Sequence, residues 1–88
     1  MYNIEYHKNA LKDIDKLKQA NIADKAKILI DIIKENPYQN PPPFEKLGGD
    51  LKECYSRRIN IQHRLVYKVH ENKKQIKILS VWSHYEKI

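Results

Sequence analysis

Hydrophobic and polar residues alternate at the start of the chain and then change to a helical period. In the opening run YNIEY, Tyr2 and Tyr6 flank Ile4 at every second position, which is the period of a half-buried strand. From about residue 7 to 19 the apolar residues recur at spacings of three and four, which predicts an amphipathic helix. The apolar face of this helix is expected to contain Ala10, Leu11, Ile14 and Leu17.

A second helix is predicted to begin after Asn21, because an asparagine side chain can accept a hydrogen bond from a free amide at a helix start. It should end near Glu35, because Pro37 disfavours helical geometry in the residue before it. The short connection predicts an antiparallel helical hairpin. The expected apolar residues of the second helix are Ile22, Ala26, Ile28, Leu29, Ile30, Ile32 and Ile33.

Residues 36–50, NPYQNPPPFEKLGGD, contain all 4 prolines and both glycines, so they are predicted to be an ordered loop. After this loop, LKECYSRRI, HRLVYKV and QIKILSVWSHY alternate as strands, with HENKKQ as a hairpin turn before the last one. The order βααβββ predicts an α+β fold, with a twisted antiparallel four-stranded sheet and a two-helix hairpin packed on one face. We expect residues 1–88 to form a single domain.

The composition is that of a globular protein with a thin core, since 41% of the 88 residues are hydrophobic and 32% are charged. No apolar run approaches the roughly 18 residues of a membrane span, so we expect no membrane association. The first residues lack the basic and apolar regions of a secretory signal, which predicts a cytoplasmic protein. Cys54, the single cysteine, is expected to be a small buried hydrophobe within a strand rather than a nucleophile.

Positive charge is concentrated in one segment. The chain carries 17 lysines and arginines against 11 acids, a net charge of +6, which favours RNA, DNA or an acidic protein as a partner. Total charge alone is weak evidence, because basic residues also serve solubility. The segment SRRINIQHRLVYK is a more specific indication of such a partner, because it contains Arg57, Arg58, Arg64 and Lys68 and no acid.

Several kinds of site are not supported by the residues. The 4 histidines do not pair with each other or with cysteine at ligand spacing, so no metal site is expected. The chain has no GxGxxG or GKS/T loop to hold a nucleotide phosphate, and no nucleophile elbow. We therefore expect no cofactor.

The remaining polar residues suit phosphodiester cleavage. RNA can be cut without a metal when a base takes the 2′-hydroxyl proton, cations stabilise the crowded phosphorane and an acid protonates the departing 5′ oxygen. A carboxylate can serve as the base, and an imidazole as the acid. The candidates are Glu45, Arg57, Arg58, Arg64, His84 and Tyr85.

Each of these candidates can also have a purely structural role, and the sequence alone does not decide between the two interpretations. Glu45 can be a solvated loop carboxylate, and Arg57 and Arg58 can be charges that keep a sheet edge from aggregating. His84 and Tyr85 can cap the last strand, with the nearby tryptophan in the core.

The segment PPPFEKLGGDLKECYSRRINIQHRLVYKV, followed by a terminal HY, resembles the YoeB (Txe/YoeB) toxins of bacterial type II toxin-antitoxin modules, in the RelE/ParE superfamily. The resemblance covers essentially the whole chain, and it implies a RelE/ParE-like, microbial-RNase-like fold. Its most specific pieces are Ser56-Arg57-Arg58-Ile59, His63-Arg64-Leu65-Val66-Tyr67 and His84-Tyr85.

This resemblance implies a ribosome-dependent, metal-independent endoribonuclease that cuts mRNA in the A site and so inhibits translation. The family's general base falls on Glu45 and its general acid on His84. Arg64 corresponds to the cation that stabilises the transition state, Arg58 to a second phosphate-binding arginine, and Tyr85 to the aromatic residue that orients the substrate. The implied products are a 2′,3′-cyclic phosphate or 3′ phosphate and a 5′ hydroxyl.

The chain departs from the family pattern in three places. Gly48 stands where a lysine is often found, so Lys46 and Lys52 are taken, with Arg57 and Arg58, as the substrate-binding cations. Gln62 replaces an acid before the His-Arg pair. The chain also continues beyond the terminal tyrosine with residues 86–88, EKI.

The resemblance also implies partners: a cognate YefM-like antitoxin, the ribosome and mRNA, with a homodimer left open. Two other functions remain alternatives. One is a ParE-like DNA gyrase inhibitor of the same fold, against which Glu45, His84 and Tyr85 argue, because a pure inhibitor has no use for an acid and a base. The other is a plain basic RNA-binding module without cleavage.

Overall fold

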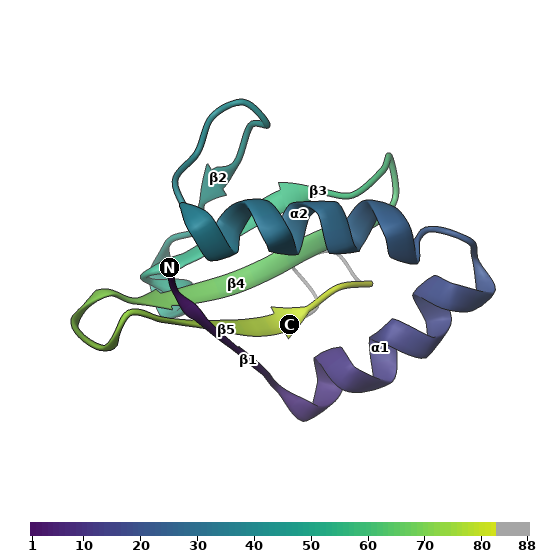
Figure 1. The fold of residues 1–88 in the computed structure, drawn as a ribbon, viewed down its shortest axis with the longest axis horizontal. Helices are drawn as coiled ribbons and strands as arrows, with labels where there is room; N and C mark the ends of the chain where they lie inside the picture. Colours follow the sequence, from purple (N-terminus) through teal and green to yellow (C-terminus); the bar gives the residue numbers. More distant parts are fainter. Residues whose placement is uncertain (83–88) are drawn as a thin grey trace.

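The computed structural model describes residues 1–82, which form two α-helices and a five-stranded sheet (Figure 1). The elements, in chain order, are β1 (Asn3–Tyr6), α1 (Lys8–Gln19), α2 (Ala23–Glu35), β2 (Glu45–Lys46), the 3-10 turn η1 (Gly49–Leu51), β3 (Cys54–Arg58), β4 (Arg64–His70), the 3-10 turn η2 (Glu71–Lys73) and β5 (Gln75–Ser80). The predicted α+β class and the helical hairpin are confirmed.

The sheet has the order β1-β5-β4-β3-β2 and differs from the expected sheet in two respects. First, β1 runs parallel to β5, with Asn3 opposite Gln75, whereas the other neighbouring strands are antiparallel. A parallel pair needs a long crossover, and the chain between these strands includes both helices. Second, Glu45 and Lys46 pair with β3 as a short fifth strand, so Glu45 lies in the sheet rather than in the loop.

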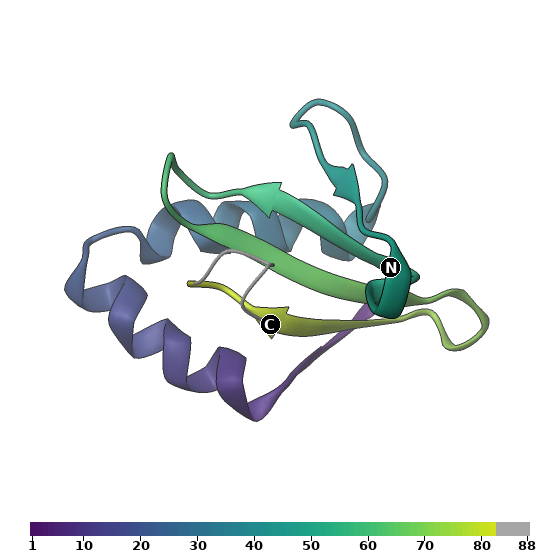
Figure 2. The same ribbon diagram turned by 180° about the vertical axis from the view of Figure 1, so that it is seen from behind.

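The helices cover one face of the sheet. Helix α2 passes in front of β3 and β4 in Figure 1 and behind them in Figure 2, and α1 packs against α2 and β5. Between the helices and the sheet lies the main core, whose buried residues are Ala10, Leu17, Ala26, Leu29, Ile33, Ile59, Leu65, Tyr67, Val69, Ile76, Ile78 and Val81. Leu11 and Ile28, which were expected on the apolar faces, are exposed. A helix on a sheet buries only one stripe of its surface, and these two positions lie outside it.

The two helices begin differently. The His7 side chain caps α1 by accepting a hydrogen bond at Nδ1 from the Asn9 amide, at 3.1 Å. The expected Asn21 cap of α2 is wrong: Asn21 has a left-handed backbone (φ 59°), and Ile22 occupies the cap position without a side-chain bond. Asparagine tolerates this conformation, so here it turns the chain between the helices.

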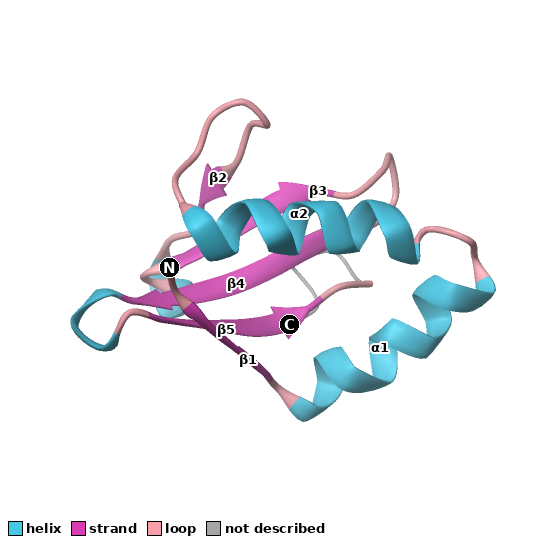
Figure 3. Ribbon diagram, in the orientation of Figure 1, coloured by secondary structure: helices cyan, strands magenta, loops and turns pink. Residues whose placement is uncertain are grey.

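A long irregular segment connects α2 to β2, as Figure 3 shows by its colour. This segment, residues 36–44, is called the proline loop below, and it leads directly into Glu45. Within residues 1–82, no helix has the length and apolar character needed to span a membrane.

Candidate active site

A shallow pocket of about 280 Å³ lies where β2, β3 and β4 meet. The register of the strands brings its polar residues together, because Glu45 is opposite Ser56 and Arg58 is opposite Arg64. Residues paired across strands share a face of the sheet, so these side chains lie on the face away from the helices. The residues lining the pocket are Pro43, Phe44, Glu45, Ser56, Arg58 and Arg64.

Glu45 and Arg64 form the charged centre of the pocket. Arg64 Nη1 lies 3.9 Å from Glu45 Oε1 and 3.4 Å from the Ser56 hydroxyl, to which it donates. The Arg64 side chain is only 17% exposed, whereas that of Glu45 is 58% exposed. An ion pair this open to water contributes little to stability. The pair therefore matters for the position of its groups: an accessible carboxylate lies beside a cation that the sheet holds in place.

This arrangement can support acid-base chemistry on an anionic substrate. An exposed carboxylate can take a proton, and the planar guanidinium groups of Arg58 and Arg64 match the geometry of phosphate oxygens. Ser56 is a residue that sequence reasoning missed. Its hydroxyl accepts the hydrogen bond from Arg64, and only the β2–β3–β4 register reveals that it sits between the two charges.

Arg57, expected to bind substrate, lies away from the pocket. Arg57 is only 1% exposed, whereas its neighbour Arg58 is exposed. The guanidinium donates to the Tyr67 hydroxyl and to backbone carbonyls of the proline loop instead of facing solvent. Successive residues of a strand point to opposite faces. Arg57 therefore points to the helix side, and its position does not support a substrate contact.

The remaining expected site residues are not in the pocket or lie beyond the described part of the chain. Lys46 and Lys52 are exposed and do not line the pocket. His84 and Tyr85 fall outside residues 1–82. The last described residue, Trp82, is held by His63, whose Nδ1 lies 2.8 Å from the Trp82 carbonyl oxygen and whose ring stacks on the indole at 4.0 Å.

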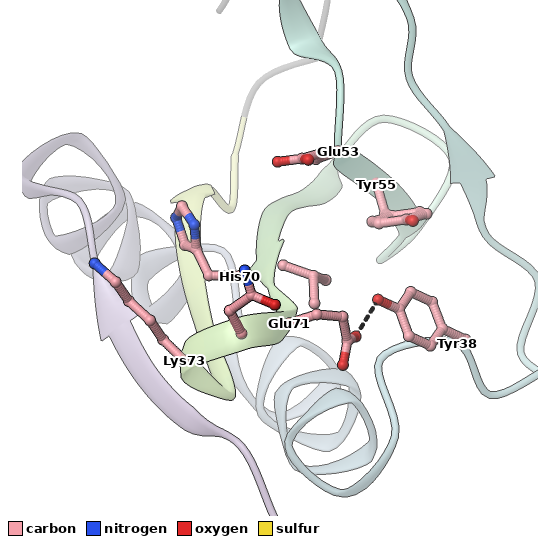
Figure 4. A pocket seen from close by; sticks show the side chains of 8 residues that line it. Tyr38, Glu53, Tyr55, His70, Glu71 and Lys73 are labelled. Carbon is pink, nitrogen blue, oxygen red and sulfur yellow. Dashed lines mark hydrogen bonds between the residues drawn. The ribbon is translucent and has the colours of Figure 1, made fainter.

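A second pocket, of about 330 Å³, lies at the other end of β4 (Figure 4). It contains Glu71, which accepts hydrogen bonds from the hydroxyls of Tyr38 and Tyr2. Because the Glu71 carboxylate is already bonded to these two hydroxyls, this pocket is less suited to catalysis than the first. Its lining residues are Tyr38, Glu53, Tyr55, Val69, His70, Glu71, Asn72 and Lys73.

Metal and thiol chemistry have little support in the described residues. Among residues 1–82, no three histidine, cysteine, aspartate or glutamate side chains form a group that could hold a metal ion. Cys54 is buried as predicted, and burial raises the pKa of its thiol, the opposite of what an activated nucleophile needs.

Comparison with known proteins gives consistent matches. The family described as YoeB-like toxin of bacterial type II toxin-antitoxin system matches residues 6–85. A relative, Toxin YoeB of Synechocystis sp., is 35% identical over 60 residues, which cover 68% of this chain and 67% of that protein. The YoeB/ParE toxin from Agrobacterium tumefaciens has a TM-score of 0.85 at 26% identity, covering 94% of this chain and 99% of that one. The heterotetrameric YoeB-YefM toxin-antitoxin complex from Staphylococcus aureus has a TM-score of 0.79 at 35% identity, covering 97% and 99%.

Proposed function

The chain belongs to the YoeB-like toxins of bacterial type II toxin-antitoxin systems, and from this premise we propose that it is a metal-independent endoribonuclease that cuts mRNA in the ribosomal A site. One observation carries the proposal: the exposed Glu45 carboxylate stands 3.9 Å from the Arg64 guanidinium in an open pocket. A pair of this kind can take a proton and neutralise a phosphate in the same place.

In the proposed reaction Glu45 takes the proton of the 2′ hydroxyl, whose oxygen attacks the phosphorus. Arg64 and Arg58 stabilise the charge that develops on the phosphorane. The bond to the 5′ oxygen then breaks, and His84 supplies the proton to that oxygen while Tyr85 orients the substrate. The products are a 2′,3′-cyclic phosphate, or a 3′ phosphate after hydrolysis, and a 5′ hydroxyl.

The proposal includes a partner and a place of action. The S. aureus relative was solved with YefM, so we expect a YefM-like antitoxin for this chain. A net charge of +6 favours an acidic segment in that antitoxin. The chain would act as a single domain in the cytoplasm, with the exposed Lys46 and Lys52 available to RNA outside the pocket.

The test is cleavage of an mRNA in translating ribosomes, mapped by primer extension across the A site. Glu45→Gln removes the proposed base and keeps the shape of the side chain, so we expect cleavage to fall about 10²- to 10⁴-fold. Glu35→Gln, at an exposed glutamate at the end of α2, is the matched control and should cleave like the wild type.

Folded wild-type protein that leaves the message intact would overturn the proposal. Inhibition of DNA gyrase in a supercoiling assay, unchanged by His84→Gln, would favour the alternative of a ParE-like inhibitor. RNA binding without cleavage would favour a plain RNA-binding module.

A further inference from the structure

Arg57 is a buried arginine whose guanidinium donates most of its hydrogen bonds to the proline loop. Its Nη1 donates to the Pro42 carbonyl at 2.6 Å, and its Nη2 donates to the Pro37 and Gln39 carbonyls at 3.1 and 2.8 Å. Its Nε donates to the Tyr67 hydroxyl at 3.1 Å. All three carbonyls belong to the proline loop, so one side chain joins both ends of that loop to β3.

Two aromatic residues complete this anchor. The Tyr67 hydroxyl accepts from Arg57 and donates to the Pro37 carbonyl at 2.7 Å, so β4 holds the loop as well. The Arg57 guanidinium carbon lies 4.8 Å from the centre of the Phe44 ring, and Phe44 directly precedes Glu45 in the chain. The contacts therefore extend from the start of the loop to the residue next to the proposed base.

The chemistry of the loop explains why an arginine suits this position. The loop is irregular and rich in proline, which lacks an amide donor, so its carbonyls depend on donors from elsewhere. A guanidinium presents five donors in a rigid plane, and three carbonyls can be bound at once in a fixed geometry. A lysine in the same place would keep the positive charge but lose the planar set of donors.

We propose that Arg57 is a positioning residue, which fixes the proline loop and thereby holds Glu45 beside Arg64 for the reaction. This inference rests on the proposed function, because it assigns Arg57 an effect through Glu45. Arg57 itself faces the helix side of β3 and does not line the pocket. It therefore acts on the reaction without touching the substrate, unlike Arg58 on the other face.

The test compares Arg57→Lys with and without Glu45→Gln in single-turnover cleavage of ribosome-bound mRNA. With Glu45 present, we expect the rate at saturating ribosomes to fall roughly 10²-fold, because a small misplacement of a catalytic group costs about that much. The half-saturating ribosome concentration should not change. With Glu45→Gln already in place, Arg57→Lys should cause no further loss, since residues that act through one another are not additive.

Ile76→Val is the matched control, because it trims the buried core on β5 away from the loop. It should lower stability without lowering the cleavage rate. If Arg57→Lys does not fold, Tyr67→Phe removes one hydroxyl from the same anchor, and its smaller loss should likewise disappear in the Glu45→Gln background. Limited proteolysis of either variant should show faster cutting in residues 36–44 than in the wild type.

The inference is overturned if a folded Arg57→Lys protein cleaves at the wild-type rate, or if the variant loses the same factor in both backgrounds. A change confined to the half-saturating ribosome concentration would also overturn it, because that result indicates a binding contact. If Glu45→Gln alone cleaves like the wild type, the proposed function fails instead, so the two failures are distinguishable.

Discussion

Glu71 is the carboxylate with the most side-chain hydrogen bonds in the described part of the chain. Both of its oxygens accept from the Tyr2 hydroxyl, at 2.8 and 3.1 Å, and it also accepts from the Tyr38 hydroxyl and from Lys74. These hydrogen bonds, with that of Tyr38 the largest cause, lower the pKa of Glu71. The pKa of Tyr38 is raised, by burial first and then by Glu71. The cluster thus favours an ionised Glu71 with two protonated tyrosines.

This cluster predicts how stability depends on pH. The pKa of Glu71 is lower in the folded than in the unfolded chain, so its contribution is present above about pH 4.3, the unfolded value, and is lost as the pH falls through the folded pKa. Glu71→Gln should therefore lower stability at neutral pH and flatten the acid side of the profile. Urea unfolding between neutral and acid pH measures this effect.

Glu35→Gln, at an exposed position on α2, should leave the shape of that profile unchanged. Tyr38→Phe should reproduce part of the Glu71→Gln effect, because it removes the largest cause of the lowered pKa. An acid side that is equally steep in the wild type and in Glu71→Gln would contradict this account.

Arg57 shows what a strand pattern can and cannot predict about a single residue. In the alternating run LKECYSRRI, Arg57 shares one side with Tyr55 and Ile59, whereas Arg58 shares the other with Ser56, and the structure has Arg57 buried and Arg58 exposed. The apolar neighbours of Arg57 were the signal that it faces the core. The error came from treating charge as evidence of exposure, whereas three loop carbonyls and a hydroxyl satisfy this buried guanidinium.

The end of β5 is joined to α1 by one buried carboxylate. Asp13 Oδ2 accepts from the Ser80 hydroxyl and from the Val81 amide, both at 3.3 Å. On the other side of the same segment, His63 holds the carbonyl of Trp82. Side chains from α1 and from the turn before β4 thus fix the last described residues, where β5 has already ended.

Asp13→Ala should destabilise the protein, because it leaves the Ser80 hydroxyl and the Val81 amide buried without their acceptor. The cost of an unsatisfied buried group is about 1–3 kcal/mol, which should appear in the free energy of unfolding measured with urea. Asp15→Ala, an exposed position on the same helix, should stay within about 0.5 kcal/mol of the wild type. Equal losses in the two variants would contradict this account, because alanine is a better helix former than aspartate and the exposed Asp15 has no contact to β5 to lose.

At the scale of elements, periodicity predicted the helices and longer strands, and it missed features that depend on distant partners. The helix over Ala23–Glu35 ends where Pro37 predicted. The parallel pairing of β1 and the short strand at Glu45 were missed, because alternation identifies a strand but not the strand beside it. The same limit applies to the site. The sequence identifies Glu45 and Arg64 as candidates, but the distance between their side chains depends on β3, which lies between their two strands.

The whole molecule presents two unlike faces of one sheet. The helices cover one face, and the other carries a small apolar cluster of Leu47, Cys54 and Val66. Lys68 and Lys77 are directly opposite each other on β4 and β5, and Lys68 is also opposite Cys54, so both lysines share the uncovered face with the pocket arginines. The acids Glu45 and Glu5 pair there with Arg64 and Lys77, so the four cations of this face exceed the two acids they meet and leave it positively charged.

This surface predicts that free RNA is bound but poorly cut. Single-stranded RNA should bind with an affinity that falls with salt, and the logarithm of the binding constant should fall with the logarithm of the salt concentration at a slope of about −0.7 for each phosphate neutralised.

The pocket, however, measures only about 280 Å³, and Glu45 is largely exposed, so the protein alone does little to shape a flexible strand. In the proposed function the ribosome supplies the near-attack geometry, so we expect a free message to be cleaved at least about 10²-fold more slowly than the same message in the A site. Cleavage of both at saturating protein, at low and high salt, separates binding from geometry. Equal rates once free RNA is fully bound would show that the toxin fold alone aligns the 2′ hydroxyl with the phosphate.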